Sequence, residues 1–179
     1  SLRPPFFLYV HYVDPHAPYS PSAAWGGGPL GEHLARRGPV EMSDLDPAKY
    51  FHRDEELLRD ALDLYDGEIR LVDDHIAKLR AKLDEIGVGG KTIIVVTSDH
   101  GDEFFEHDRK GHHRTLYDEI LRVPLIVYVP GAKPQRGEVA METSTIDIMP
   151  TVLGRVGAPV PPGVEGADLT GVAYLGRPE

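Results

Sequence analysis

Asp99 and His100 are the residues whose types and place in the chain most directly indicate chemistry. They follow an apolar, β-type run over residues 92–96, so a buried strand would deliver a carboxylate and an imidazole to the carboxyl edge of a sheet. Open α/β sheets bind their ligands at that edge. A carboxylate beside an imidazole is a donor pair suited to a divalent cation. The alternative is a loop aspartate that caps a helix next to a surface histidine.

Further side chains that could handle protons or anions lie in two other segments. His16 follows an apolar run over 6–12 and a proline, which places it at the end of a predicted strand. His112 and His113 lie in a polar stretch, and either could donate a proton to a leaving oxygen, because histidine titrates near neutrality. Lys110 could stabilise an oxyanion, whereas the simpler interpretation is an exposed lysine in a charged loop.

The periodicity of the apolar residues predicts the elements that must position these groups. A stripe with steps of three and four residues predicts an amphipathic helix over 54–86, with Gly87 as its C-cap. Other expected elements are strands over 6–12, 92–97, 123–129 and 139–145, a helical turn within 115–121, and a helix over about 146–154 capped by Ser144 or Thr145. The Pro-, Gly- and Ala-rich residues 17–50 are expected to form a long loop.

The strand over 92–97 sets the expected fold class. Its consecutive β-branched residues lack polar alternation, which indicates burial on both faces, as in a parallel sheet. With the long helix beside it, this predicts an α/β fold with a mostly parallel sheet. A chain of 179 residues is ordinarily one domain, so residues 1–179 are expected to form a single domain.

Composition excludes some classes of partner. The formal net charge is −10, from 19 basic and 29 acidic side chains, which argues against nucleic acid as a partner because its phosphates require a basic face. An anionic substrate is still compatible with this charge, because a bound metal ion would reverse the local sign. The chain has no cysteine and hence no disulfide framework. No signal peptide and no apolar run of transmembrane length is evident.

Five segments of the chain, taken together and in order, resemble the sulfatase family of the alkaline phosphatase superfamily. They are Phe7-Leu-Tyr-Val-His-Tyr-Val-Asp-Pro-His-Ala-Pro-Tyr19, Tyr65-Asp-Gly-Glu-Ile-Arg-Leu-Val-Asp-Asp74, Val96-Thr-Ser-Asp-His-Gly-Asp-Glu-Phe104, Thr115-Leu-Tyr-Asp-Glu-Ile-Leu-Arg-Val-Pro-Leu125 and, more weakly, Asp147-Ile-Met-Pro-Thr-Val-Leu153. The resemblance implies a metal-dependent sulfuric-ester hydrolase that acts on a small anionic ester. It also implies part of an alkaline-phosphatase-like αβα sandwich.

The resemblance implies roles for individual residues. Asp99 and His100 match two metal ligands of the family, and His16 matches a histidine that contacts the sulfuryl group. Relatives with Gly-His-Gly before the Thr-Leu-Tyr segment favour His112 as the acid, whereas relatives with a lysine at a different spacing favour His113. We interpret His112 as the acid. Calcium is the usual metal of the family.

The chain also departs from the family pattern. It has no Cys/Ser-x-Pro-x-Arg motif, the source of the formylglycine nucleophile, and no aspartate pair after a first strand. We therefore expect the C-terminal portion of a sulfatase catalytic domain, which lacks its N-terminal half and is inactive alone. Strand edges that the missing half would cover could pair two copies into a homodimer.

One substitution and one absence keep two other functions open. His100 stands where many sulfatases have asparagine, and imidazole is a poor calcium ligand, so zinc, manganese or magnesium is favoured. The same substitution supports a phosphoester or phosphonate hydrolase, or a phosphotransferase, of the same superfamily. The missing nucleophile leaves a noncatalytic interaction module as a third possibility.

Overall fold

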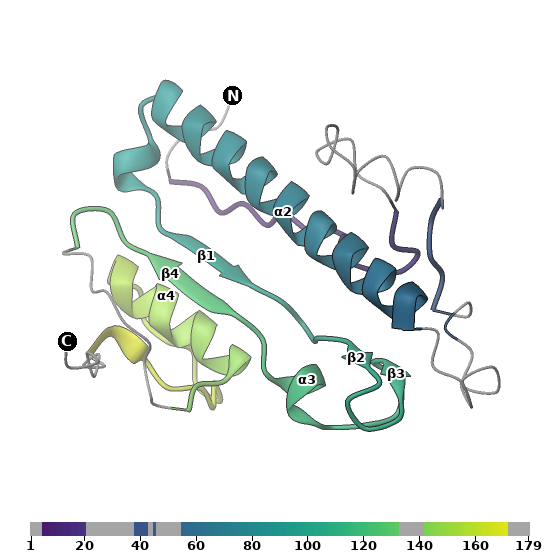
Figure 1. Ribbon diagram of the computed structural model, residues 1–179. Helices are drawn as coiled ribbons and strands as arrows, with labels where there is room; N and C mark the ends of the chain where they lie inside the picture. Colours follow the sequence, from purple (N-terminus) through teal and green to yellow (C-terminus); the bar gives the residue numbers. More distant parts are fainter. Residues whose placement is uncertain (1–4, 21–37, 43–44, 46–54, 133–141, 172–179) are drawn as a thin grey trace, which may run out of the picture. The chain divides into compact units, whose positions relative to one another are not determined.

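The computed structural model describes residues 5–20, 38–42, 45, 55–132 and 142–171. Its elements are α2 (Glu55–Glu85), η3 (Gly89–Lys91), β1 (Ile94–Thr97), β2 (Glu103–Phe104), β3 (Lys110–Gly111), α3 (Asp118–Leu121), β4 (Leu125–Tyr128), η4 (Thr145–Asp147), α4 (Ile148–Val156) and η5 (Leu169–Gly171) (Figure 1). The chain divides into a first unit, residues 1–89 with 100–122, and a second unit, residues 90–99 with 123–179. Most of the predicted loop over 17–50 lies outside the described residues.

The long helix α2 confirms the prediction from apolar periodicity. Its first turn carries Glu55 and Glu56, where the partial positive charge of a helix N-terminus favours acidic side chains. It ends before Gly87, whose φ of 77° is costly for other residues and common in a helix C-cap. The helix continues without a break through Gly67.

The core of the first unit gathers residues from distant parts of the chain. Its buried members are Tyr19, Val40, Leu45, Ala61, Leu64, Phe104 and Phe105. The face of α2 that enters this core lies in the first half of the helix. Ile69 and Ile86, which belong to the predicted apolar stripe, are exposed.

The strand predicted over 6–12 is not observed. These residues form no β-ladder within the part of the chain that is described, and Phe7 and Tyr9 are 87% and 75% exposed. Figure 1 shows the segment running beside α2, and the ring of Tyr12 stacks on that of His75 at 6.1 Å. The prediction of a buried strand was wrong for this chain because an apolar run becomes a strand only where a neighbouring strand pairs with it.

The second unit contains the strand pair β1–β4. Both strands confirm predictions, and they run antiparallel with Ile94 opposite Tyr128 and Thr97 opposite Leu125. The other described pair, β2–β3, is also antiparallel. The α/β class is confirmed, but these pairs differ from the mostly parallel sheet that was expected, because an unbroken apolar run reports burial and not strand direction.

The helix expected over about 146–154 is η4 followed by α4. Pro150 lies in the first turn of α4, where its missing N–H costs no helical hydrogen bond. Ser144 is the N-cap of η4, as one of the two predicted caps. Most of the strand expected over 139–145 lies outside the described residues, and residues 142–144 have no regular structure. Among the described helices, none is long and apolar enough to cross a membrane.

Replacement of Asp147 by alanine is expected to destabilise the second unit by about 1–2 kcal/mol. Its carboxylate accepts hydrogen bonds from the backbone N–H groups of Ser144 (2.8 Å) and Ala167 (2.7 Å). These bonds hold the pKa of Asp147 below its usual range. Its contribution is therefore present above pH about 4 and lost as pH falls through the lowered pKa. Urea unfolding of Asp147→Ala across pH measures this loss, and an equal loss at pH 2 and pH 7 would contradict it.

Candidate metal and acid-base site

A short hairpin builds the candidate site in the first unit. In the β2–β3 pair Glu103 lies opposite Gly111, so the next positions outward in the same register are Asp102 and His112. The hairpin thereby brings an aspartate and a histidine ten residues apart into contact. Its turn contains Phe105 and Asp108 with φ of 71° and 56°. Few residues adopt such φ values, so the register depends on these two positions.

Asp102 is engaged at both carboxylate oxygens. Oδ1 lies 2.7 Å from His112 Nδ1, and Oδ2 accepts a hydrogen bond of 2.8 Å from the Tyr19 hydroxyl. The side chain of Asp102 is 7% exposed and that of His112 is 19% exposed. A carboxylate shielded from water in this way interacts more strongly with its partners than an exposed one does.

The rings of His16 and His100 both contact the ring of His112. Its ring stacks on that of His100 with centroids 3.9 Å apart, and the ring of His16 meets it edge-on at 5.5 Å. Gly101 fixes the backbone next to His100, because its N–H donates a hydrogen bond of 2.9 Å to the carbonyl oxygen of Ile120. A Cβ at Gly101 would collide with the carbonyl oxygen of Glu119, so only glycine fits this turn. The structure thus brings together His16, His100 and His112.

The donor atoms of His100, Asp102 and His112 fit a divalent metal ion. One ligand atom from each residue lies within 4.8 Å of the other two. Two imidazoles and a carboxylate are a donor set that zinc and other transition metals accept and that calcium, which prefers oxygen, accepts poorly. The sequence analysis missed Asp102. The spacing of ten residues between Asp102 and His112 could have indicated that they meet, but only once the register of the hairpin is known.

The other predicted site residues have different surroundings. Asp99 is the last residue of a segment of the second unit, and its Oδ1 lies 3.5 Å from Ser98 Oγ. His113 is exposed, with its ring 4.4 Å from that of His112. The ammonium group of Lys110 donates to the carbonyl oxygens of Met42 and Leu45, so this lysine anchors a neighbouring loop. The metal-ligand role predicted for Asp99 and the catalytic roles predicted for His113 and Lys110 stay predictions.

Tyr19 links the site to the core. Its side chain is fully buried, and its ring packs edge-on against Tyr65 at 5.6 Å and beside Phe104 at 5.8 Å. Burial, and secondarily the charge of Asp102, raises the pKa of Tyr19 far above its ordinary value. The hydroxyl therefore keeps its proton and donates a hydrogen bond to Asp102.

Glu68 is a buried carboxylate on α2 close to this site. It is 2% exposed, its Oε1 accepts a hydrogen bond of 2.9 Å from Ser20 N, and its Oε2 has no hydrogen-bond partner. Burial raises the pKa of Glu68, against the lowering effect of the Ser20 N–H. The raised pKa means that the folded chain holds this proton more tightly than the unfolded chain does.

Glu68→Gln is expected to stabilise the chain at neutral pH by on the order of 1 kcal/mol, because glutamine carries no charge to desolvate. A raised pKa contributes stability that is complete below pH about 4 and disappears as pH rises through the folded-state pKa. The wild type should therefore lose stability relative to Glu68→Gln as the pH rises through the folded-state pKa of Glu68. Urea unfolding at several pH values tests this, with the exposed Glu165→Gln as control. Parallel stability curves for wild type and Glu68→Gln would contradict the prediction.

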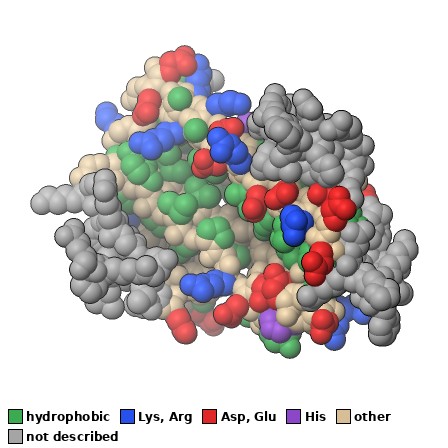
Figure 2. Space-filling view, in the orientation of Figure 1, with side chains coloured by type: hydrophobic (Ala, Val, Ile, Leu, Met, Phe, Trp, Pro, Cys, Tyr) green, Lys and Arg blue, Asp and Glu red, His purple; other side chains and the backbone are tan. Residues whose placement is uncertain are grey.

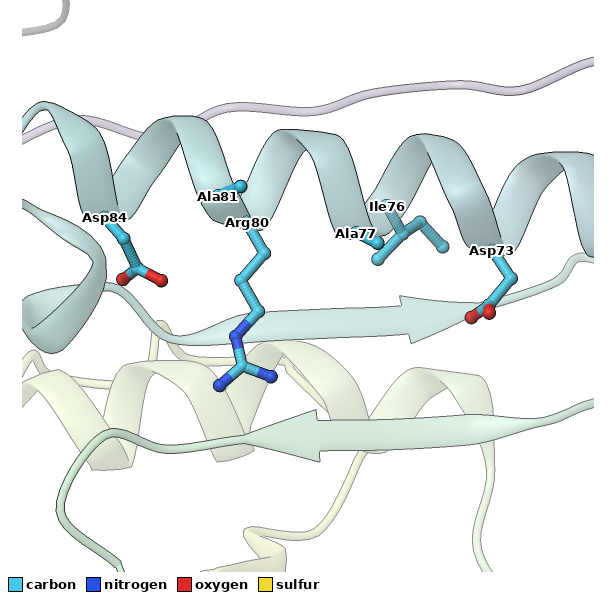
Figure 3. Close-up of a pocket in the computed structure, with 6 residues that line it drawn as sticks. All are labelled: Asp73, Ile76, Ala77, Arg80, Ala81 and Asp84. Carbon is cyan, nitrogen blue, oxygen red and sulfur yellow. The ribbon is translucent and has the colours of Figure 1, made fainter.

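A separate hollow of about 400 Å³ lies on α2. It is lined by Asp73, Ile76, Ala77, Arg80, Ala81 and Asp84. Figure 3 shows that these side chains leave one side of the helix, and the set includes none of the site histidines. On the face shown in Figure 2, basic and acidic side chains are interspersed. The hollow is thus distinct from the histidine site in its residues and in its chemistry.

Comparison with known proteins matches this chain to one family. The sulfatase family model matches residues 1–158. An ulvan-active sulfatase from Formosa agariphila is 33% identical over 177 residues, which cover 98% of this chain and 33% of the relative. The phosphonate monoester hydrolase of Silicibacter pomeroyi is a solved structure with a TM-score of 0.61 and 30% identity, covering 84% of this chain and 29% of that chain.

A third relative is a solved protein in complex with its substrate, D-glucosamine-2-N,6-O-disulfate. It is 31% identical with a TM-score of 0.53, and the match covers 72% of this chain and 27% of that one. This chain therefore spans about a third of the length of its relatives. The family implies a divalent metal, and the histidine and aspartate donors described above could hold one. The chain belongs to the sulfatase family and has its alkaline-phosphatase-like α/β fold.

Proposed function

We propose that this chain is the C-terminal portion of the catalytic domain of a sulfuric-ester hydrolase. The observation that carries the proposal is the meeting of His16, His100 and His112 beside the buried Asp102. Hydrolysis of a sulfate ester needs a positive centre for the sulfuryl oxygens, a nucleophile and an acid for the leaving oxygen. The three histidines supply candidates for the first and the last of these needs.

Each histidine takes one role. His112 donates a proton to the leaving oxygen, and His16 contacts the sulfuryl group. His100 and Asp99 hold a divalent metal ion, which when bound supplies positive charge to the anionic ester. The imidazole of His100 favours zinc, manganese or magnesium over calcium. The predicted substrate is a small sulfate ester.

The nucleophile is expected from outside these 179 residues, as a formylglycine in the N-terminal half of the domain. The exposed apolar segment that contains Phe7 and Tyr9 supports a partner of this kind, because large exposed apolar side chains mark a surface that another segment covers. Without that half, two copies of the chain pair through the strand edges that it would cover. Sedimentation of the chain alone would show the dimer as a doubled mass.

A specific observation also favours a phosphoester or phosphonate hydrolase. The metal-site candidate His100 is an imidazole, and a phosphonate monoester hydrolase is among the similar solved structures. Assays of a longer protein that contains this chain, with matched aryl sulfate, aryl phosphate and aryl phosphonate substrates, separate the alternatives. The proposal expects the highest kcat/KM on the sulfate and no turnover by the 179 residues alone. Faster hydrolysis of phosphate or phosphonate would favour the alternative, and no turnover of any ester would favour an interaction module.

A further inference from the structure

We propose that Asp102 and Tyr19 are positioning residues that fix His112 in the tautomer with its proton on Nδ1, which leaves Nε2 as the nitrogen that faces substrate chemistry. The inference rests on the proposed function, since it names what prepares His112 for proton transfer. It assigns no catalytic role to Asp102 or Tyr19 themselves. Both act through His112.

The directions of the two hydrogen bonds to Asp102 determine where the proton of His112 lies. An ionised carboxylate can only accept hydrogen bonds, and Asp102 has a partner at each oxygen. The Tyr19 hydroxyl, 2.8 Å from Oδ2, must therefore donate. Likewise, His112 Nδ1, 2.7 Å from Oδ1, must carry the proton that it donates. In a neutral imidazole only one nitrogen carries a proton, so Nε2 holds the lone pair. The acid form of His112 gains its second proton at Nε2 and donates that proton to the leaving oxygen.

The core holds Tyr19 and Asp102 in fixed positions next to His112. Tyr19 exchanges two backbone hydrogen bonds with Val40, of 2.8 and 2.7 Å, and its ring is enclosed by Tyr65 and Phe104. Its hydroxyl thus has a fixed position in the core. Asp102 is held at the other side by the register of β2 and β3. The core therefore orients Asp102, and Asp102 orients the imidazole of His112.

The hydrogen bond to Asp102 orients the ring of His112, and the neighbouring rings pack around it. The other described ring contacts of His112 are with His16, His100 and His113, whose ring centroids lie 5.5, 3.9 and 4.4 Å from its own. An alternative is that Asp102 serves as a ligand to a metal ion. The two explanations predict different behaviour when zinc is added, because a metal ion bound to Asp102 would compete with its hydrogen bond to His112 Nδ1.

Long-range ¹H–¹⁵N NMR of the metal-free chain tests the proposal, because the ¹⁵N shifts of imidazole distinguish its tautomers. Spectra are recorded above pH 8, and His112→Gln assigns the signals. Wild type is expected to show His112 protonated at Nδ1. Asp102→Asn is expected to move the proton to Nε2, since an asparagine amide can donate to Nδ1. The exposed Asp108→Asn, in the same hairpin, is the matched control and should leave the tautomer unchanged.

Tyr19→Phe separates the contributions of the two positioning residues. It keeps the buried ring but removes the donor to Asp102, so the Nδ1–H tautomer should become less populated and the averaged ¹⁵N shifts of His112 should move toward those of the Nε2–H tautomer. A wild-type His112 protonated at Nε2 would overturn the proposal, as would an Asp102→Asn variant with the wild-type pattern. The wild-type spectrum decides the matter even if a variant fails to fold.

The NMR result is independent of the proposed function. A fixed tautomer with no sulfatase activity in the longer protein would refute the function and leave the positioning role intact. If the longer protein is active, Asp102→Asn should lower kcat by about 10³–10⁴-fold, by analogy with a loss of the correct histidine tautomer in a serine protease. KM should change much less, because the substrate contacts of the other residues are kept.

Discussion

Alanine in place of His112 is expected to lower kcat on an aryl sulfate by about 10²–10⁴-fold in a longer protein that contains this chain. The imidazole of His112 is the best-positioned proton donor of the site, since Asp102 holds its Nδ1 at 2.7 Å. Loss of a general acid raises the barrier for departure of the leaving oxygen. Steady-state kinetics with a series of aryl sulfates measures the change.

Two comparisons show whether His112 is the acid: esters with different leaving groups, and the His113→Ala variant. An ester with a strongly acidic phenol needs less help from an acid, so His112→Ala should slow it less than an ester of an unactivated alcohol. His113→Ala is expected to lower kcat less than about tenfold, because His113 is exposed, whereas the hydrogen bond of Asp102 is to His112. An equal loss for all leaving groups, or a larger loss with His113→Ala, would contradict the assignment of the acid to His112.

Alanine in place of His100 is expected to weaken zinc binding to the chain by at least about tenfold. The proposed function assigns His100 and Asp99 to the metal ion, so loss of the His100 imidazole removes one of its ligands. Isothermal titration calorimetry of wild type and His100→Ala measures the difference. Wild type should bind zinc more tightly than calcium, because imidazole prefers transition metals.

His107→Ala is the matched control for a general loss of imidazole. His107 lies in the same hairpin, where its ring stacks on Tyr117 at 3.6 Å and its Nδ1 lies 3.5 Å from Glu119. Its removal should leave the zinc affinity unchanged. Tighter binding of calcium than of zinc, or equal zinc affinity in wild type and His100→Ala, would show that His100 does not bind the metal ion.

Local patterns in the sequence predicted the elements well where neighbouring residues decide the structure. The stripe of apolar residues predicted α2, and the β-branched run predicted β1, because each pattern repeats with the period of its element. The run over 6–12 shows the limit of this reasoning. The same pattern did not become a strand, because a strand also requires a partner that local residues do not specify.

The histidines and the family could be identified from the sequence alone, because they depend on residue types in a fixed order along the chain. That order pointed to His16, His100 and His112, and the structure brings these three together. The roles of the residues around them were decided by tertiary structure. Tyr19 and Asp102 are 83 positions apart, and only the folded core and the hairpin register bring them into hydrogen-bond contact. Contacts between distant residues follow from packing of the whole unit, which periodicity along the chain does not encode.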